Sequence, residues 1–197
     1  MARIGYRRSS LPAVGLLIAV NALVFIATMV NYKLIFLLGL QPASFPERPW
    51  TIVTSLFAHA GLWHILANMI TLYFFGSNLA KLVGKKGFLI TYFLGGIVGN
   101  IFYIFLGLPF STIIGASGAV FAIGGALAVM RPRLRVLVFP IPVPLQLWVA
   151  VIGGFIIISL LPQVAWQAHL GGLVYGLTTG YFFRRREHRR LSAWYHY

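Results

Sequence analysis

Long apolar segments alternate with short polar or basic ones along most of the chain. Each is about 17 to 22 residues long, the length that an α-helix needs to cross the hydrocarbon core of a bilayer. Six are predicted, at about residues 11–32, 62–83, 87–106, 114–130, 145–161 and 164–183. The alternation of apolar and polar positions that marks a transmembrane barrel is absent from the sequence. The pattern therefore predicts an all-α, polytopic membrane protein built as a bundle of six transmembrane helices.

Basic residues cluster in every second connection, which predicts the orientation of the bundle. Of the 16 Lys and Arg residues, 14 lie before the first segment, between the second and third, between the fourth and fifth, or after the sixth. The positive-inside rule makes that side cytoplasmic, so both termini are expected inside a multi-pass protein of the cell membrane. These residues are Arg3, Arg7, Arg8, Lys81, Lys85, Lys86, Arg131, Arg133, Arg135, Arg184, Arg185, Arg186, Arg189 and Arg190.

Composition supports a membrane protein and narrows its partners. Hydrophobic residues make up 59% of the chain and charged residues 9%, against about 25% charged in a soluble domain. We expect one membrane domain over residues 1–197, with a six-helix core at about 11–183 and a basic cytoplasmic tail at 184–197. The basic residues that give the net charge of +14 cluster at the ends of the predicted spans. They therefore predict contact with the lipid bilayer and not with nucleic acid. The external connection at 33–61 is apolar and is expected to lie in the membrane interface.

The residue types that the chain lacks exclude several chemistries. It has no cysteine, which excludes thiol catalysis, cysteine-bound metals and disulfides. Its only acidic residues are Glu47 and Glu187, both outside the predicted spans, and no HExxH zinc motif occurs. We therefore expect no metal and no cofactor. The chemistry that remains uses hydroxyls, imidazoles, amides and the backbone.

Four polar side chains are predicted to lie at one depth, in the outer third of the bilayer. His64 begins the second segment, and Asn68 follows four residues later on the same helical face. Ser117 lies in the first turn of the fourth segment, and His169 lies about one turn into the sixth. All three segments run inward from the outer surface in the predicted topology. Polar residues inside a membrane are candidates for function by default.

Small residues explain how two of these groups can meet. They recur at intervals of four on the fourth and sixth segments, and such faces let helix backbones approach closely. His169 precedes Gly172 by three residues and so lies on the face of the sixth segment, where close approach would bring it within hydrogen-bonding reach of Ser117. The small residues are Gly118, Ala122 and Ala126 on the fourth segment and Gly172, Gly176 and Gly180 on the sixth.

A serine beside a histidine suggests nucleophilic catalysis. A serine hydroxyl becomes a good nucleophile when a base takes its proton, and His169 is the candidate base for Ser117. Because no acidic residue lies within the predicted spans, we predict a dyad and not a triad. His64, Asn68 and the backbone N–H of Ser117 are candidates to stabilise the negative charge of an oxyanion.

Each of these residues also has an ordinary structural explanation. A serine in a transmembrane helix usually bonds to its own backbone, His64 suits an interfacial position, and Asn68 suits a hydrogen bond between helices. The glycine faces alone indicate packing. The agreement in depth of all four polar groups favours the catalytic interpretation. Of the other polar residues, Asn21 and Asn100 are predicted to be structural, and His59, His188 and His196 to be surface or interfacial.

Three motifs resemble those of the rhomboid family of intramembrane serine proteases. They are HILAN from His64 to Asn68 on the second segment, GASG around Ser117 on the fourth, and AHLGGLVYG from residue 168 to 176 on the sixth. Together with the order of the six spans, the resemblance covers about residues 11–183. It implies that Ser117 is the nucleophile and His169 the general base, with His64, Asn68 and the Ser117 backbone in the oxyanion hole.

The resemblance adds further expectations and two departures. Phe121 stands where the family often has a tyrosine that stacks on the catalytic histidine, so stacking is kept and a hydroxyl is lost. The fifth helix and the cap before it would gate the access of a substrate helix, and a cavity open to the outside would supply water. Near residues 76–80 the chain lacks the glutamate that many relatives carry, and the family's Trp-Arg pair occurs reversed in Arg48-Pro49-Trp50.

The sequence thus predicts an endopeptidase that cleaves transmembrane segments of other proteins near the outer face. Its partners would be those transmembrane substrates, cut where small or helix-destabilising residues allow the helix to unwind. The alternative is a non-catalytic rhomboid-like protein that binds or escorts transmembrane clients, although inactive relatives typically lose the serine or the histidine. A transporter or channel is disfavoured, since the spans contain neither an acidic residue nor an identifiable pair of broken helices.

Overall fold

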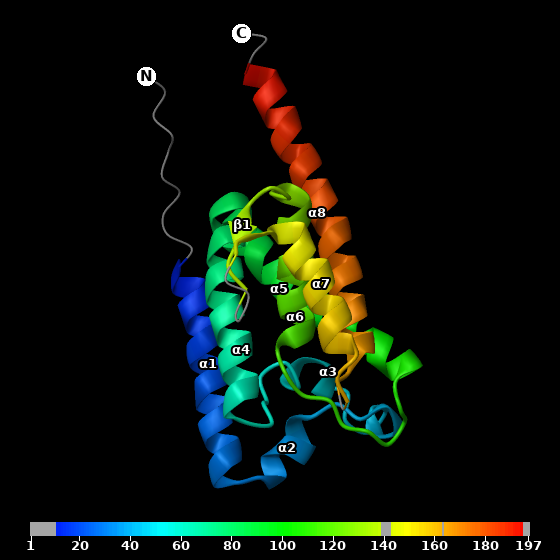
Figure 1. Cartoon of the computed structure of the whole chain (residues 1–197). Coiled ribbons are helices and arrows are strands. Elements are labelled where there is room, and N and C mark those ends of the chain that lie inside the picture. Colours follow the sequence, from blue (N-terminus) through cyan, green and yellow to red (C-terminus); the bar gives the residue numbers. More distant parts are fainter. Residues whose placement is uncertain (1–10, 139–142, 163, 195–197) are drawn as a thin grey trace.

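The computed structural model describes residues 11–138, 143–162 and 164–194. These residues form a bundle of helices, as the sequence predicts, with one small two-stranded sheet (Figure 1). Apolar residues from the long helices pack into one buried core. The long helices are α1 (Leu11–Val30), α4 (Leu62–Thr71), α5 (Ser77–Leu106), α6 (Ser117–Met130), α7 (Leu147–Ser159) and α8 (Trp166–Trp194).

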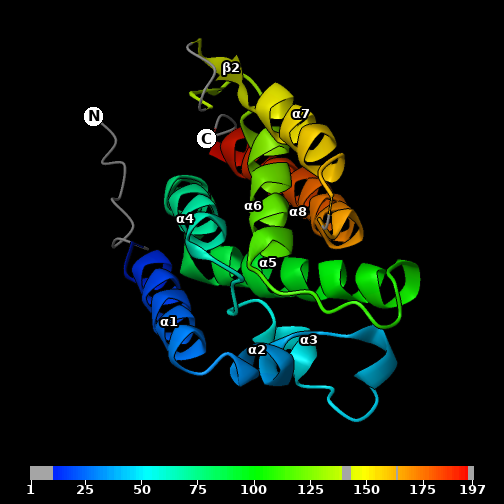
Figure 2. The same cartoon turned by 60° about the horizontal axis from the view of Figure 1, so that its bottom comes forward.

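Helix α6 lies at the centre of the bundle and is almost wholly buried (Figure 2). It packs against α5, α7 and α8, and α8 makes the most extensive of these contacts. Its sequence, SGAVFAIGGALAVM, is rich in glycine and alanine, which leaves room for neighbouring backbones to come close. A thin central helix of this kind brings the N-terminal ends of α6 and α8 together.

The second and third predicted segments form an almost continuous helical path. A π-helical stretch, η2 (Leu72–Gly76), joins α4 to α5, and within α5 only Gly84 leaves the helical conformation, with φ 78° and ψ 172°. This left-handed region of φ favours glycine because it has no Cβ. The turn between the two predicted spans is therefore a single residue, where the sequence indicated a break at 83–87.

The helix lengths bear on the predicted membrane crossings. Two helical stretches, Pro12–Val30 and Leu62–Leu106, are long and apolar enough to cross a bilayer. Helices α6 and α7 are shorter, with 14 and 13 residues. The count of six crossings thus stays a prediction. Beyond residue 183, α8 continues to Trp194, so the predicted tail is helical over most of its length.

The connection at 33–61, which was predicted to be external, is ordered by short helices and by contacts to backbone oxygens. It contains α2 (Lys33–Leu38), the 3₁₀ helix η1 (Pro42–Ser44) and α3 (Thr51–Thr54). The side chains of Arg48, Trp50 and Thr54 donate hydrogen bonds to the carbonyl oxygens of Phe36, Leu37 and Leu38 in turn. The last carbonyls of a helix have no partner inside the helix, so these bonds cap α2. They anchor the connection without a glutamate from the second segment.

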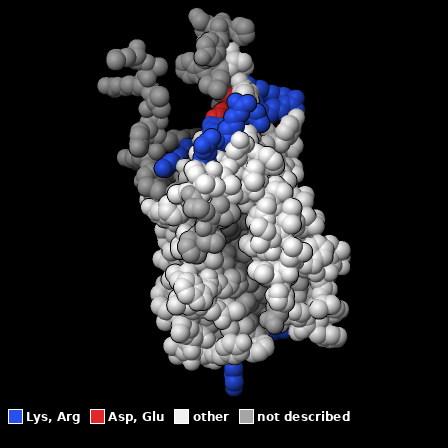
Figure 3. Space-filling model, viewed as in Figure 1, with Lys and Arg blue, Asp and Glu red and all other residues white. Residues whose placement is uncertain are grey.

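Most charged residues gather at the end of the bundle from which α8 protrudes (Figure 3). There Arg131, just after α6, makes a bidentate pair with Glu187 on α8, with N–O distances of 2.6 and 2.9 Å. Arg184 also donates to the carbonyl oxygen of Val129 at 3.2 Å. The strands β1 (Arg135–Val136) and β2 (Leu145–Gln146) pair antiparallel between α6 and α7. Arg3, Arg7, Arg8 and His196 lie outside the described residues.

Candidate active site

Ser117 is the first residue of α6. It follows an extended loop over residues 107–116, which we call the serine loop. Leu40 pairs with Ile113 in an isolated antiparallel bridge, which anchors this loop. Gly115 follows with φ +125°, a conformation that residues with a Cβ rarely adopt. Ala116 then precedes the first turn of α6. This path places both the hydroxyl and the backbone N–H of Ser117 at a helix N-terminus, where negative charge is favoured.

Ser117 and His169 are hydrogen-bonded to each other. The distance from Ser117 Oγ to His169 Nε2 is 2.7 Å, although 52 residues separate them. His169 lies in the first turn of α8, is 6% exposed, and has no hydrogen-bond partner for Nδ1 among the described residues. When the hydroxyl donates to Nε2, the imidazole proton sits on Nδ1. This geometry matches that of a nucleophile and its base.

The predicted glycine faces produce this approach. A Cβ on Gly172 would overlap the carbonyl oxygen of Gly118, and a Cβ on Gly176 would overlap that of Ala122. The backbones of α6 and α8 are therefore in direct contact along this face. Gly118 faces the carbonyl oxygen of Ala168, one residue before the histidine. Packing of glycine on backbone thus sets the position of His169 over α6.

His64 reaches the serine loop from α4. A Cβ on Gly115 would lie 2.7 Å from His64 Nε2, so the ring occupies the space that the glycine leaves. On its other side, Nδ1 of His64 lies 3.5 Å from the backbone N of Ala60. The structure therefore brings His64 beside the residues that precede Ser117.

Asn68 is buried one turn further along α4. Its side-chain nitrogen donates to the carbonyl oxygen of His64 at 2.9 Å. Within the described part of the chain, it makes no hydrogen bond to Ser117. Its place in an oxyanion hole accordingly stays a prediction, and the contact found ties it to the turn that carries His64.

Phe121, one turn after Ser117 on α6, packs on the imidazole of His169. The ring centroids are 4.8 Å apart and the planes are inclined at 35°. On its far side, Phe121 meets Phe155 of α7 edge-on, with centroids 5.9 Å apart. Phe121 is thus held between the histidine and α7.

His59 was predicted to be surface or interfacial, and this was wrong. It is 1% exposed, and its Nε2 accepts a hydrogen bond from the backbone N–H of Ala116 at 3.4 Å. Its Nδ1 lies 3.3 Å from the carbonyl oxygen of Phe57, which fits a proton on Nδ1. Burial, with a smaller effect of His64, lowers the pKa of His59 from 6.5 to about 4. The available sequence signal was its position in an apolar stretch five residues before His64.

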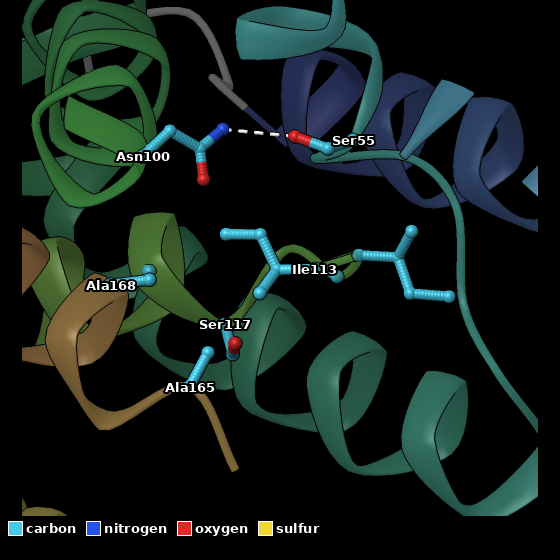
Figure 4. A pocket seen from close by; sticks show the side chains of 9 residues that line it. Ser55, Asn100, Ile113, Ser117, Ala165 and Ala168 are labelled. Atoms are coloured by element: carbon cyan, nitrogen blue, oxygen red, sulfur yellow. Dashed lines mark hydrogen bonds between the residues drawn. The ribbon is translucent and has the colours of Figure 1, made fainter. Parts of the chain in front are cut away.

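A small cavity lies beside Ser117 (Figure 4). Its volume is about 20 Å³, and its polar lining comes from Ser117, Ser55 and Asn100. Asn100, on α5, donates to Ser55 Oγ at 2.9 Å. Asn100 therefore links α5 to the residue that follows α3, as its predicted structural role requires. This link lies next to the candidate nucleophile.

The described residues include no cluster of three or more His, Cys, Asp or Glu side chains that could hold a metal ion.

Comparison with known proteins assigns the chain to a family. The family model named Rhomboid domain matches residues 46–186, which include Ser117, His169, His64, Asn68 and Phe121. The chain belongs to the rhomboid family.

Individual rhomboid proteins support the same assignment. This rhomboid chain is 31% identical over 166 residues to Rhomboid protein 1, mitochondrial, of Saccharomyces cerevisiae, covering 73% of this chain and 45% of the yeast protein. It is 37% identical over 100 residues to Rhomboid-like protease 3 of Toxoplasma gondii, covering 50% of this chain and 38% of that protein. It is 35% identical over 146 residues to RHOMBOID-like protein 12, mitochondrial, of Arabidopsis thaliana, covering 64% and 44%. The chain spans less than half the length of these relatives.

Proposed function

We propose that this rhomboid is a serine endopeptidase that uses Ser117 and His169 as a catalytic dyad. The observation that carries the proposal is the 2.7 Å hydrogen bond between Ser117 Oγ and His169 Nε2 at the partly buried junction of α6 and α8. Family membership supports it further, since one of the similar proteins is named a rhomboid-like protease. Because the chain spans less than half the length of the three relatives compared above, the proposal rests on the residues of the site and not on the activity of whole relatives.

The proposed reaction forms and breaks one covalent bond to the serine. Ser117 Oγ attacks the carbonyl carbon of the scissile peptide while His169 Nε2 takes the hydroxyl proton. The tetrahedral oxyanion receives hydrogen bonds from the Ser117 N–H and from His64 and Asn68. His169 then gives the proton to the leaving amine. In deacylation, His169 takes a proton from water, the resulting hydroxide attacks the acyl-enzyme, and the proton returns to Ser117.

The proposed substrates are transmembrane segments of other proteins. A substrate helix would approach from the side of the bundle, past α7. Only Leu147 and Val151 of α7 are buried, and no Cα atom of this helix lies within 8 Å of one in α4. The sparse packing supports α7 as the element that moves to admit a substrate. Unwinding of the substrate helix would expose the peptide carbonyl to Ser117.

The proposed setting is a membrane, with both termini on its cytoplasmic side and the active site opening to the outer side. The concentration of Lys and Arg at one end of the bundle supports this orientation (Figure 3). The apolar helices α2 and α3 and the capped loop around them would then lie in the outer interface.

The first prediction tests the nucleophile. Ser117→Ala should abolish cleavage of a model transmembrane substrate by the purified protein, because the alanine has no hydroxyl to form the acyl-enzyme. The matched control is Ser192→Ala in the protruding part of α8, where the hydroxyl bonds only to the carbonyl oxygen of Arg189 among described residues. This control should cleave at the rate of the parent. Equal cleavage by Ser117→Ala and the parent would refute the proposal.

A fluorophosphonate probe separates the protease from a non-catalytic binding protein. Covalent labelling that requires both Ser117 and His169 is expected of the enzyme, because the probe reacts only with an activated serine. A protein that merely escorts transmembrane clients would bind a substrate helix without being labelled.

A further inference from the structure

Asn100 lies where α5 meets the end of α3 and the serine loop (Figure 4). It is 4% exposed, and its side-chain nitrogen donates two hydrogen bonds to residues far away in the sequence. One goes to the carbonyl oxygen of Ile52 at 2.7 Å, and the other to Ser55 Oγ at 2.9 Å. A single amide group of α5 thus holds the last turn of α3 and the residue that follows it.

Ser55 passes this restraint to the candidate nucleophile. Its carbonyl oxygen accepts the backbone N–H of Gly115 at 2.8 Å. Gly115 stands two residues before Ser117 and has the left-handed φ of +125°, so its peptide orientation sets the direction in which the chain enters α6. The hydroxyl of Ser55 binds Asn100 while its carbonyl binds Gly115. The two ends of one residue therefore connect α5 to the serine loop.

Asn21 is a buried asparagine whose described hydrogen bond stays within its own helix. It is fully buried in α1, and its side-chain nitrogen donates to the carbonyl oxygen of Leu17 in the same helix at 2.8 Å. That bond holds nothing beyond α1. Asn100 differs because both of its acceptors belong to the segment that supports Gly115, and because it lines the same cavity as Ser117.

We propose that Asn100 is a positioning residue for Ser117, acting through Ser55 and Gly115. The proposal rests on the proposed function, since the position of Ser117 matters to the reaction rate only if Ser117 is the nucleophile. Without the Asn100 amide, Ser55 and the Gly115 peptide gain freedom, and the Ser117 hydroxyl and N–H spend less time aligned for attack. A misplacement of about 1 Å in a reacting group can cost about a hundredfold in rate. The loss is expected in kcat, because Asn100 acts on the alignment of Ser117 through Ser55 and Gly115.

The experiment compares Asn100→Ala with Asn21→Ala in the purified full chain. Each variant is measured for thermal stability, for the rate of labelling by a fluorophosphonate, and for kcat and KM on a model transmembrane substrate. Asn100→Ala should lower the labelling rate and kcat about tenfold or more, with KM within about twofold of the parent. Asn21→Ala should lower the melting temperature and leave the labelling rate of the folded protein unchanged.

Ser55→Ala provides a second, independent variant. It removes one of the two acceptors of Asn100 and keeps the carbonyl that binds Gly115, so a smaller fall of about threefold in labelling rate is expected. The proposal is overturned if folded Asn100→Ala is labelled at the parent rate, or if Asn21→Ala slows labelling equally. If Asn100→Ala does not fold, parent-like labelling of Ser55→Ala overturns it. Absence of labelling in the parent itself would instead refute the proposed function.

Discussion

His169 is oriented without a carboxylate, and the residues around it show how. Its Nδ1 has no hydrogen-bond partner among the described residues, so no acceptor there fixes the ring. Phe121 packs on one face of the imidazole, and the Ser117 hydroxyl lies at Nε2. The ring is therefore held by stacking and by the close packing of α8 on α6. As the base of the proposed dyad, His169 would depend on the shape of its surroundings more than on a charge partner.

A pH-dependent prediction concerns His59. Its pKa of about 4 in the folded protein lies below its ordinary value of 6.5, so the unfolded chain binds more protons between these two values. Stability should therefore be constant above about pH 6.5 and should fall as the pH is lowered toward 4, by at most about 1.4 kcal/mol per pH unit from this group. Protonation would also place a second N–H against that of Ala116.

The check is the melting temperature of the parent and of His59→Gln between pH 7.5 and pH 4.5. Glutamine offers an acceptor for the Ala116 N–H and does not titrate, so the variant should lose less stability on acidification. Parallel curves for the two proteins would show that His59 is not the group responsible.

At the scale of single residues, the sequence predicted which side chains form the candidate site better than it predicted their burial and hydrogen bonds. Ser117 and His169 could be paired because glycine spacing makes close approach of two helices foreseeable. The burial of His59 could not be foreseen, because a loop residue is buried or exposed according to tertiary packing that leaves no periodic pattern. The hydrogen bonds of Asn100 to residues 48 and 45 positions away escaped prediction for the same reason.

At the scale of elements, the contact between α6 and α8 is the one on which the site depends. Gly176→Ala should destabilise the protein by about 1–3 kcal/mol, because the new methyl group would overlap the backbone oxygen of Ala122 and force the helices apart. Ser117 and His169 would separate as well, so labelling by a fluorophosphonate should slow.

The matched control is Gly154→Ala on α7, where an added Cβ has no atom within 4 Å. It should leave stability unchanged or raise it by up to about 1 kcal/mol, since alanine favours the helix. Thermal unfolding of both variants checks the prediction. An equal loss of stability in the two would mean that close packing of α6 and α8 is not the cause.

The sequence located the helical segments well and their ends less well. Apolar length identified each segment, since burial in a bilayer or a core requires it. The break at Gly84 was expected to be several residues long, because three lysines nearby indicate a loop. The short strands β1 and β2 escaped prediction, as two-residue strands are too short to show an alternating pattern.

At the scale of the whole molecule, one ion pair among the described residues links the end of α6 to α8 at the charged end of the bundle. Arg131 and Glu187 are both partly exposed, with side chains 38% and 36% accessible, and Arg131 lowers the pKa of Glu187 through its hydrogen bonds. This stabilisation is present above the ordinary pKa of a glutamate and is lost as the pH falls through the lowered value. Solvent screening keeps the contribution small.

Glu187→Gln should therefore lower the free energy of unfolding by less than about 1 kcal/mol at low ionic strength, and by less still in high salt. Melting temperatures at two salt concentrations provide the measurement. Glu47→Gln is the control, because Glu47 is exposed and makes no salt bridge to another described residue. A loss of several kcal/mol in the free energy of unfolding would instead indicate that the pair contributes strongly to the packing of α8 on α6.

The single-residue turn at Gly84 has a consequence for how the protein is made. Helical structure runs up to this glycine and resumes directly after it, and the flanking Lys81, Lys85 and Lys86 are exposed. A connection of one residue fixes the point at which the two arms meet. The stretches on either side should therefore enter the membrane in close succession, turning at Gly84, with the lysines retained at the turn. His64 and Asn100 would then reach their final depths one shortly after the other.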